Sequence, residues 1–208
     1  AEPEGPDGGG SASRRLPRRL RRASARRAVF VVIVSLSGRL FATLCSMPKK
    51  NQPVVHAVVP SAGRGTRFLP ITKSVPKEML PVVDRPSIEY IVREATDAGI
   101  EDILFVTRAG KQSIEDYFDA EPGLEADLEK AGKEKALEYV NEYKKYARVH
   151  SVRQGHPLGL GHAILQAKSH VGDAPCAVLL PDDLMEPGSQ LLRKMIQVRG
   201  ALGGTVVA

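Results

Sequence analysis

The chain contains little cysteine. Its 208 residues include only two cysteines, Cys45 and Cys176, which lie far apart and without the spacing of metal ligands. The sequence therefore predicts neither a disulfide framework nor a cysteine-based zinc site, and it is consistent with a reducing cytoplasm. Cys176 stands in the apolar segment 174–180, where we expect a small core side chain rather than a nucleophile.

The chain also lacks a long hydrophobic run. The apolar segment 28–36 is followed by Arg39, well before it reaches the roughly 20 apolar residues that a membrane-spanning helix needs. We therefore expect no membrane span.

An excess of one charge is missing from most of the chain. Residues 1–46 hold nine of the 30 basic residues and three of the 24 acidic residues, which leaves 21 of each sign from Met47 onward. Binding to nucleic acid through counterion release needs a basic face on the folded domain. A neutral domain argues against that class of function.

From Met47 onward, apolar β-branched segments alternate with amphipathic ones. The patterns predict strands at 54–60, 100–107, 148–152, 175–180 and 205–207. They predict helices at 87–98, 112–118, 124–146, 161–169 and 190–198, with Ser87 as an N-cap, Gly99 as a stop and a weak point at Gly132. This alternation predicts an α/β fold in three layers, with a mostly parallel, Rossmann-like sheet.

In such a sheet, ligands bind beyond the carboxyl ends of the strands. We therefore expect a site built from the loops 61–66, 107–110, 154–161 and 181–183.

The segment Ser-Ala-Gly-Arg-Gly-Thr-Arg at 61–67 directly follows the first of these strands. Its glycines let backbone N–H groups approach phosphate oxygens, and Arg67 adds a bidentate cation. The segment lacks the Gly-Lys-Ser/Thr of a P-loop, and Phe68 stands where a dinucleotide fingerprint has its third glycine. On the glycines alone, a tight structural turn and a phosphate cradle are equally good interpretations.

The neighbouring motifs decide between them. Phe-Leu-Pro at 68–70, Pro-Lys-Glu-Met-Leu-Pro at 76–81, Arg-Gln-Gly at 153–155, Gly-Leu-Gly-His at 159–162 and Leu-Pro-Asp at 180–182 follow in order. Together with the glycine loop they resemble the signature of the sugar-1-phosphate nucleotidyltransferases, and most closely that of the bacterial uridylyltransferases acting on UTP and glucose 1-phosphate. The resemblance covers residues 54–208.

The resemblance implies a nucleotide-diphospho-sugar transferase fold whose C-terminal part, with the sugar site and a second metal-binding aspartate, is missing here. It implies that UTP and glucose 1-phosphate form UDP-glucose and pyrophosphate by in-line attack on the α-phosphorus, in a cytoplasmic enzyme that is a homo-oligomer when full length. Arg67 and Lys77 would be catalytic, and Asp182 would bind Mg²⁺. The implied nucleotide-binding residues are Ala62, Gly63, Gly65, Thr66, Arg67, Lys77, Gln154 and Gly159.

Several residues also have simpler interpretations. Lys77 could be a solvated lysine, Lys73 could be a partner of Glu78, and Asp183 could be a cap. For His162 we expect neutral packing or capping, and for His56 a place in the core. For the whole chain, the same chemistry on another nucleotide or sugar phosphate remains open. So does a nucleotide-binding fragment without activity.

The Arg-rich segment 1–46 also has two interpretations. A basic stretch followed by an apolar one resembles an export signal. Export would separate the catalytic domain from cytoplasmic nucleoside triphosphates, and the chain begins with Ala1 rather than methionine. We therefore favour a disordered or non-native upstream extension, with the domain, incomplete at its C-terminus, running from Met47 to residue 208.

Overall fold

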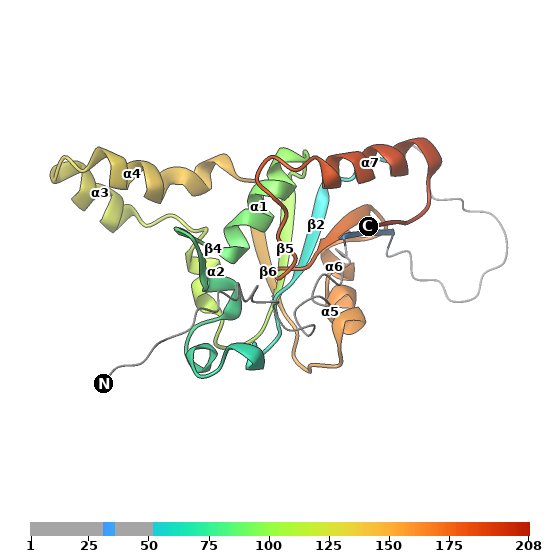
Figure 1. The fold of residues 1–208 in the computed structure, drawn as a ribbon, viewed down its shortest axis with the longest axis horizontal. Helices are drawn as coiled ribbons and strands as arrows, with labels where there is room; N and C mark the ends of the chain where they lie inside the picture. Colours follow the sequence, from blue (N-terminus) through green and yellow to red (C-terminus); the bar gives the residue numbers. More distant parts are fainter. Residues whose placement is uncertain (1–30, 36–51) are drawn as a thin grey trace, which may run out of the picture.

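The computed structural model describes residues 52–208 and the backbone of residues 31–35. The described residues form a six-stranded sheet in the order β6-β5-β2-β7-β1-β8 (Figure 1). Its strands are β1 (Val31–Ser35), β2 (His56–Pro60), β5 (Asp102–Thr107), β6 (Arg148–Arg153), β7 (Pro175–Leu179) and β8 (Val206–Val207). The four strands β6, β5, β2 and β7 are mutually parallel. The predicted α/β fold with a mostly parallel sheet is confirmed.

Strand β1 extends this sheet in the opposite direction. It pairs antiparallel with β7, Val32 opposite Val178, and antiparallel with β8. From its composition this segment is expected to belong to the upstream extension, whereas the structure places its backbone in the sheet. A run of β-branched residues suits a strand that pairs with a buried neighbour. The expected boundary at Met47 lies outside the described residues.

Helices cover both faces of the sheet. They are α1 (Ser87–Asp97), α2 (Gln112–Asp116), α3 (Pro122–Lys130), α4 (Glu134–Val140), α5 (Leu160–Gln166), α6 (Lys168–Val171) and α7 (Leu191–Leu202). Because side chains alternate along a strand, Ala57 and Val59 pack with α1 and α7 in one core, while Val58 packs with α5 and α6 in the other. These two cores make the fold three-layered.

The predicted long helix at 124–146 is instead three short elements. Helix α3 ends before Gly132, which has a φ of 63°, and α4 is followed by the 3₁₀ segment η5 (Asn141–Lys145). Glycine adopts this left-handed conformation without steric cost, so the helix breaks at the predicted weak point. Helices α3 and α4 project away from the sheet (Figure 1).

Two further expectations concern single side chains. Ser87 is not the N-cap of α1; Pro86 holds that position, and the Ser87 hydroxyl donates to the Glu78 carbonyl at 3.0 Å. Cys176 is buried, and burial raises the pKa of its thiol to about 11, as expected for a core residue. Cys45 lies outside the described residues. No helix among the described residues has the length and apolar character to cross a membrane.

Candidate nucleotide site at the strand ends

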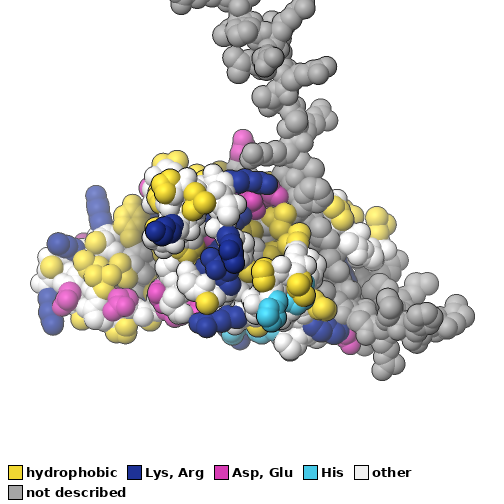
Figure 2. Space-filling model, turned by 90° about the horizontal axis from the view of Figure 1, so that it is seen from below, with side chains coloured by type: hydrophobic (Ala, Val, Ile, Leu, Met, Phe, Trp, Pro, Cys, Tyr) yellow, Lys and Arg dark blue, Asp and Glu magenta, His cyan; other side chains and the backbone are white. Residues whose placement is uncertain are grey.

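The predicted loops meet at the carboxyl edge of the sheet, at the bottom of Figure 1. Backbone hydrogen bonds fix their starting points, from Ser61 N to the Val106 carbonyl at 2.8 Å and from Gln154 N to the Thr107 carbonyl at 2.8 Å. The loops that follow three parallel strands therefore begin side by side. Viewed from below, this face carries several Lys and Arg side chains (Figure 2).

The glycine loop leaves β2 and closes against the segment that carries Lys77. Gly65 has a φ of 66°, and a Cβ placed on it would lie 3.1 Å from the Lys77 Cβ and 3.2 Å from the Thr72 Cγ2. The Thr72 hydroxyl donates to the Gly65 carbonyl at 2.8 Å. Gly63 instead faces open space. Gly65 is thus needed for conformation and close approach, while Gly63 leaves the loop accessible to a ligand.

The structure brings together two predicted residues that are far apart in the sequence. Lys77 begins the 3₁₀ segment η4 (Lys77–Met79), and Asp182 follows β7. The Lys77 Nζ lies 3.1 Å from the Asp182 Oδ2, with 18% of the Lys77 side chain and 55% of the Asp182 side chain exposed. The interpretation of Lys77 as a freely solvated lysine does not fit this exposure and this partner.

A buried ion pair beneath the loop was not predicted from the sequence. Lys111, which precedes α2, donates from Nζ to the Ser61 carbonyl and to the Glu78 Oε2, the latter at 2.7 Å. Lys111 and Glu78 are 3% and 1% exposed. Lys111 therefore ties the start of the glycine loop to the residue next to Lys77. The alternative pairing of Lys73 with Glu78 is wrong, because Lys73 is exposed and Glu78 pairs with Lys111.

Two of the predicted nucleotide-binding residues, Gln154 and Gly159, lie together on the neighbouring loop. The Gln154 Nε2 donates to the Gly159 carbonyl at 3.3 Å and lies 2.9 Å from the His162 Nδ1. Gly159 has a φ of 100° just before α5, a conformation that favours glycine. His162 thus orients Gln154, which agrees with the expected packing role. Gln154 is 7% exposed, so its contacts hold it in one place.

The loops at this edge are rich in positive charge. Arg64, Arg67 and Lys73 are exposed on the segment after β2, and Arg108 follows β5 with a buried Nε that has no hydrogen-bond partner among the described residues. Arg67 lies in the 3₁₀ segment η2 (Thr66–Phe68) beside the glycine loop. Convergent cations and backbone N–H groups are the groups that bind a polyphosphate. Arg108 is a candidate that the sequence motifs did not single out.

Asp182 is the expected metal ligand. Its carboxylate is exposed and touches Lys77 rather than a second acid. Mg²⁺ commonly takes one or two protein carboxylates and completes its shell with water and phosphate oxygens. The exposed carboxylate of Asp182 is a donor that suits Mg²⁺.

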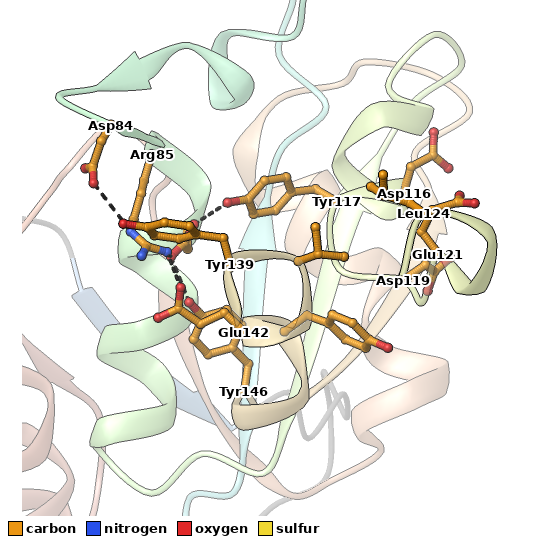
Figure 3. A pocket seen from close by; sticks show the side chains of 13 residues that line it. Asp84, Arg85, Asp116, Tyr117, Asp119, Glu121, Leu124, Tyr139, Glu142 and Tyr146 are labelled. Carbon is orange, nitrogen blue, oxygen red and sulfur yellow. Dashed lines mark hydrogen bonds and ion pairs between the residues drawn. The ribbon is translucent and has the colours of Figure 1, made fainter. Parts of the chain in front are cut away.

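A cavity lies between α1 and the projecting helices (Figure 3). This cavity has a volume of about 560 Å³. Its lining includes Arg85, Glu89, Tyr117, Glu142 and Tyr146. The Glu89 carboxylate accepts hydrogen bonds from Tyr117, from Tyr146 at 2.7 Å and from Arg85 at 2.5 Å.

The charge of the Glu89 carboxylate is compensated by its neighbours, and the network therefore stabilises the fold. Burial opposes ionisation of Glu89, but the hydrogen bonds of Tyr117, Tyr146 and Arg85 outweigh it and lower the pKa of the carboxyl. Burial and the Glu89 carboxylate raise the pKa of Tyr117. Arg93 joins Glu142 at 2.6 Å and so links α1 to η5. The network fastens the projecting helices to α1.

Comparison with known proteins agrees with the motifs. A family model described as nucleotidyl transferase matches residues 56–207. The chain is 51% identical over 157 residues to UTP–glucose-1-phosphate uridylyltransferase YngB of Bacillus subtilis (strain 168), covering 76% of this chain and 53% of that protein. It is 48% identical over 154 residues to UTP–glucose-1-phosphate uridylyltransferase 2 of Staphylococcus saprophyticus, covering 74% and 53%. The chain spans about half the length of these curated relatives.

Solved structures give the same picture. UDP-glucose pyrophosphorylase from Acinetobacter baumannii is 52% identical with a TM-score of 0.68, over 72% of this chain and 53% of that one. A UTP-bound structure of the enzyme from the same organism gives the same values. A UDP-glucose pyrophosphorylase complexed with UDP-glucose is 42% identical with a TM-score of 0.59, over 70% and 53%.

Proposed function

Because the chain belongs to the nucleotidyl transferase family, we propose that the whole protein forms UDP-glucose and pyrophosphate from UTP and glucose 1-phosphate. The chain itself would contribute the nucleotide half of the site. The relatives named as uridylyltransferases and the UTP-bound structural neighbour support this choice of substrates.

The observation that carries the proposal is the meeting of Lys77 and Asp182 beside the glycine loop. Nucleotidyl transfer needs positioning and charge neutralisation more than covalent chemistry from the protein. We propose that N–H groups of 62–66 hold phosphate oxygens and that Arg67 and Lys77 neutralise the triphosphate. Gln154 and Gly159 would take the uracil edge, which needs both donors and acceptors.

Asp182 would hold a magnesium ion against the phosphate oxygens. Such an ion neutralises charge on the phosphates and favours departure of pyrophosphate. Lys77 now neutralises the Asp182 carboxylate. With nucleotide bound, the Lys77 ammonium would instead neutralise charge on the phosphates without a large movement.

Isotope exchange between pyrophosphate and UTP tests the function on this chain. Direct in-line attack predicts exchange only when glucose 1-phosphate is present. Exchange without the sugar phosphate would instead indicate a covalent uridylyl-enzyme, and no exchange in either case would contradict activity of this chain. Replacing UTP with ATP, GTP or dTTP tests the base, and replacing glucose 1-phosphate with other sugar phosphates tests the second substrate.

One alternative is a nucleotide-binding chain without activity. It predicts that UTP binds, as measured by calorimetry, while no exchange occurs. A cytoplasmic location and a homo-oligomer remain predictions for the whole protein, as does a domain that begins at Met47.

A further inference from the structure

Three parallel strands place an ionisable side chain on one face of the sheet, near their amino ends. His56 begins β2, Asp102 begins β5, and His150 lies on β6 opposite Leu104. His56 and Val58 share a face, as do Asp102 and Leu104, because side chains alternate along a strand. Val58 and Leu104 both belong to the core beneath α5 and α6. Helix α6 adds His170 above this position.

Two of the three histidines contact one oxygen of the Asp102 carboxylate. The Nε2 atoms of His170 and His150 lie 3.3 Å and 3.2 Å from the Asp102 Oδ1. Ligand atoms of His56, Asp102 and His170 all lie within 4.8 Å of one another. The His56 and His170 rings meet edge to face, with centroids 6.3 Å apart. In a tetrahedral zinc site, ligand atoms lie roughly 3.3 Å from one another, so small side-chain movements would close this group around an ion.

The neighbourhood favours a cation at this position. The Nδ1 of His56 is buried and has no hydrogen-bond partner among the described residues. A buried nitrogen without a partner is costly, and a metal ion would satisfy it. Asp102 is 9% exposed, and its other oxygen lies 3.6 Å from the exposed Arg148. Arg148 contacts only this second oxygen, whereas Oδ1 faces the imidazoles of His150 and His170.

We propose that His56, Asp102 and His170 bind a divalent transition-metal ion of the zinc type, with His150 available as the fourth ligand. Imidazole nitrogens favour zinc over magnesium, which prefers oxygen ligands. The site differs from the nucleotide site, because His56 lies at the opposite end of β2 from Ser61, about 16 Å away at the usual rise per residue. The ion would join three strands to α6 and stabilise the fold.

Zinc chloride added to the metal-free chain tests the proposal. Competition with a chromogenic chelator is expected to show one Zn²⁺ per chain, and Mg²⁺ at about hundredfold excess is not expected to displace it. His56→Gln and His170→Gln are each expected to weaken binding by more than the roughly 10–100-fold typical of losing an outer-shell partner. His156→Gln is the matched control, because His156 is exposed on the loop after β6 and away from the group.

A second measurement needs no substitution. The chain has five histidines, so NMR of labelled imidazoles can follow each ring on addition of Zn²⁺. The signals of His56, His150 and His170 are expected to shift together, while those of His156 and His162 stay unchanged. Absence of binding would show that only protons occupy the group. Equal shifts of all five rings, or undiminished binding in both cluster variants, would show surface binding. Each of these three results overturns the proposal.

Discussion

Substitution of Lys111 by methionine tests how the glycine loop is held in place. The ammonium of Lys111 is buried, donates to the Ser61 carbonyl and pairs with Glu78 at 2.7 Å. Removing one partner of a buried ion pair typically costs about 3–5 kcal/mol, since the other charge stays buried without compensation. At about 2–4 °C per kcal/mol for a chain of this size, the melting temperature should fall by roughly 6–20 °C.

The double variant Lys111→Met with Glu78→Leu separates the pair from the loop contact. Removing both charges should recover about 2 kcal/mol or more of the loss in Lys111→Met, because no uncompensated charge remains. Part of the loss should persist, because the Ser61 carbonyl still lacks its donor. Urea unfolding followed by circular dichroism measures each step, and the exposed Lys73→Met is the control, expected to change stability by about 0.5 kcal/mol or less.

Two outcomes would refute this reasoning. Equal stability of Lys111→Met and Lys73→Met would show that the buried pair contributes nothing net. A coupling energy between the two substitutions below about 0.5 kcal/mol would show that Lys111 and Glu78 do not act as a pair. UTP titration of Lys111→Met adds a functional measurement, since loosening of Ser61 should weaken nucleotide binding even where the chain is fully folded.

Gly65→Ala should lower stability by about 1–2 kcal/mol because of the positive φ of Gly65, and by more through crowding. Gly63→Ala should keep stability and lower UTP affinity. Equal melting temperatures of the two variants would contradict the predicted loss of stability in Gly65→Ala. Burial raises the pKa of Glu94 to about 7. The contribution of the protonated carboxyl to the free energy of unfolding is therefore fully present below the ordinary pKa near 4.5 and is lost as the pH rises through 7. Glu94→Gln should therefore match the parent at pH 5 and exceed its stability at pH 8 by about 1–2 kcal/mol, after allowance for solvent screening; denaturant unfolding at both pH values decides. Lys77→Ala should reduce the exchange rate far more than UTP affinity, and equal losses would mean that it acts only in ground-state binding.

The sequence by itself determined the parallel sheet and the edge at which the loops of the candidate site lie. Apolar β-branched runs alternated with amphipathic segments, and these two patterns are typical of strands and of helices respectively. The strands at 100–107 and 175–180 were located to within two residues. For Gly65 the sequence left a tight turn and a phosphate cradle open, and the structure added its left-handed φ and its close approach to Lys77. Lys77 and Asp182 were predicted as site residues from the motifs, and the structure shows that they contact each other.

Tertiary structure alone decided which distant residues share a site. No sequence signal pointed to Lys111, since a lysine is normally exposed. Only its burial and its hydrogen bond to the Ser61 carbonyl show that it holds the start of the glycine loop. The segment 31–35 looked like part of an extension, because strand pairing is a long-range contact that local composition does not encode. His56 was expected to lie in the core. Only strand order and register bring Asp102, His150 and His170 to it, because a parallel sheet aligns positions that its crossover connections keep far apart along the chain.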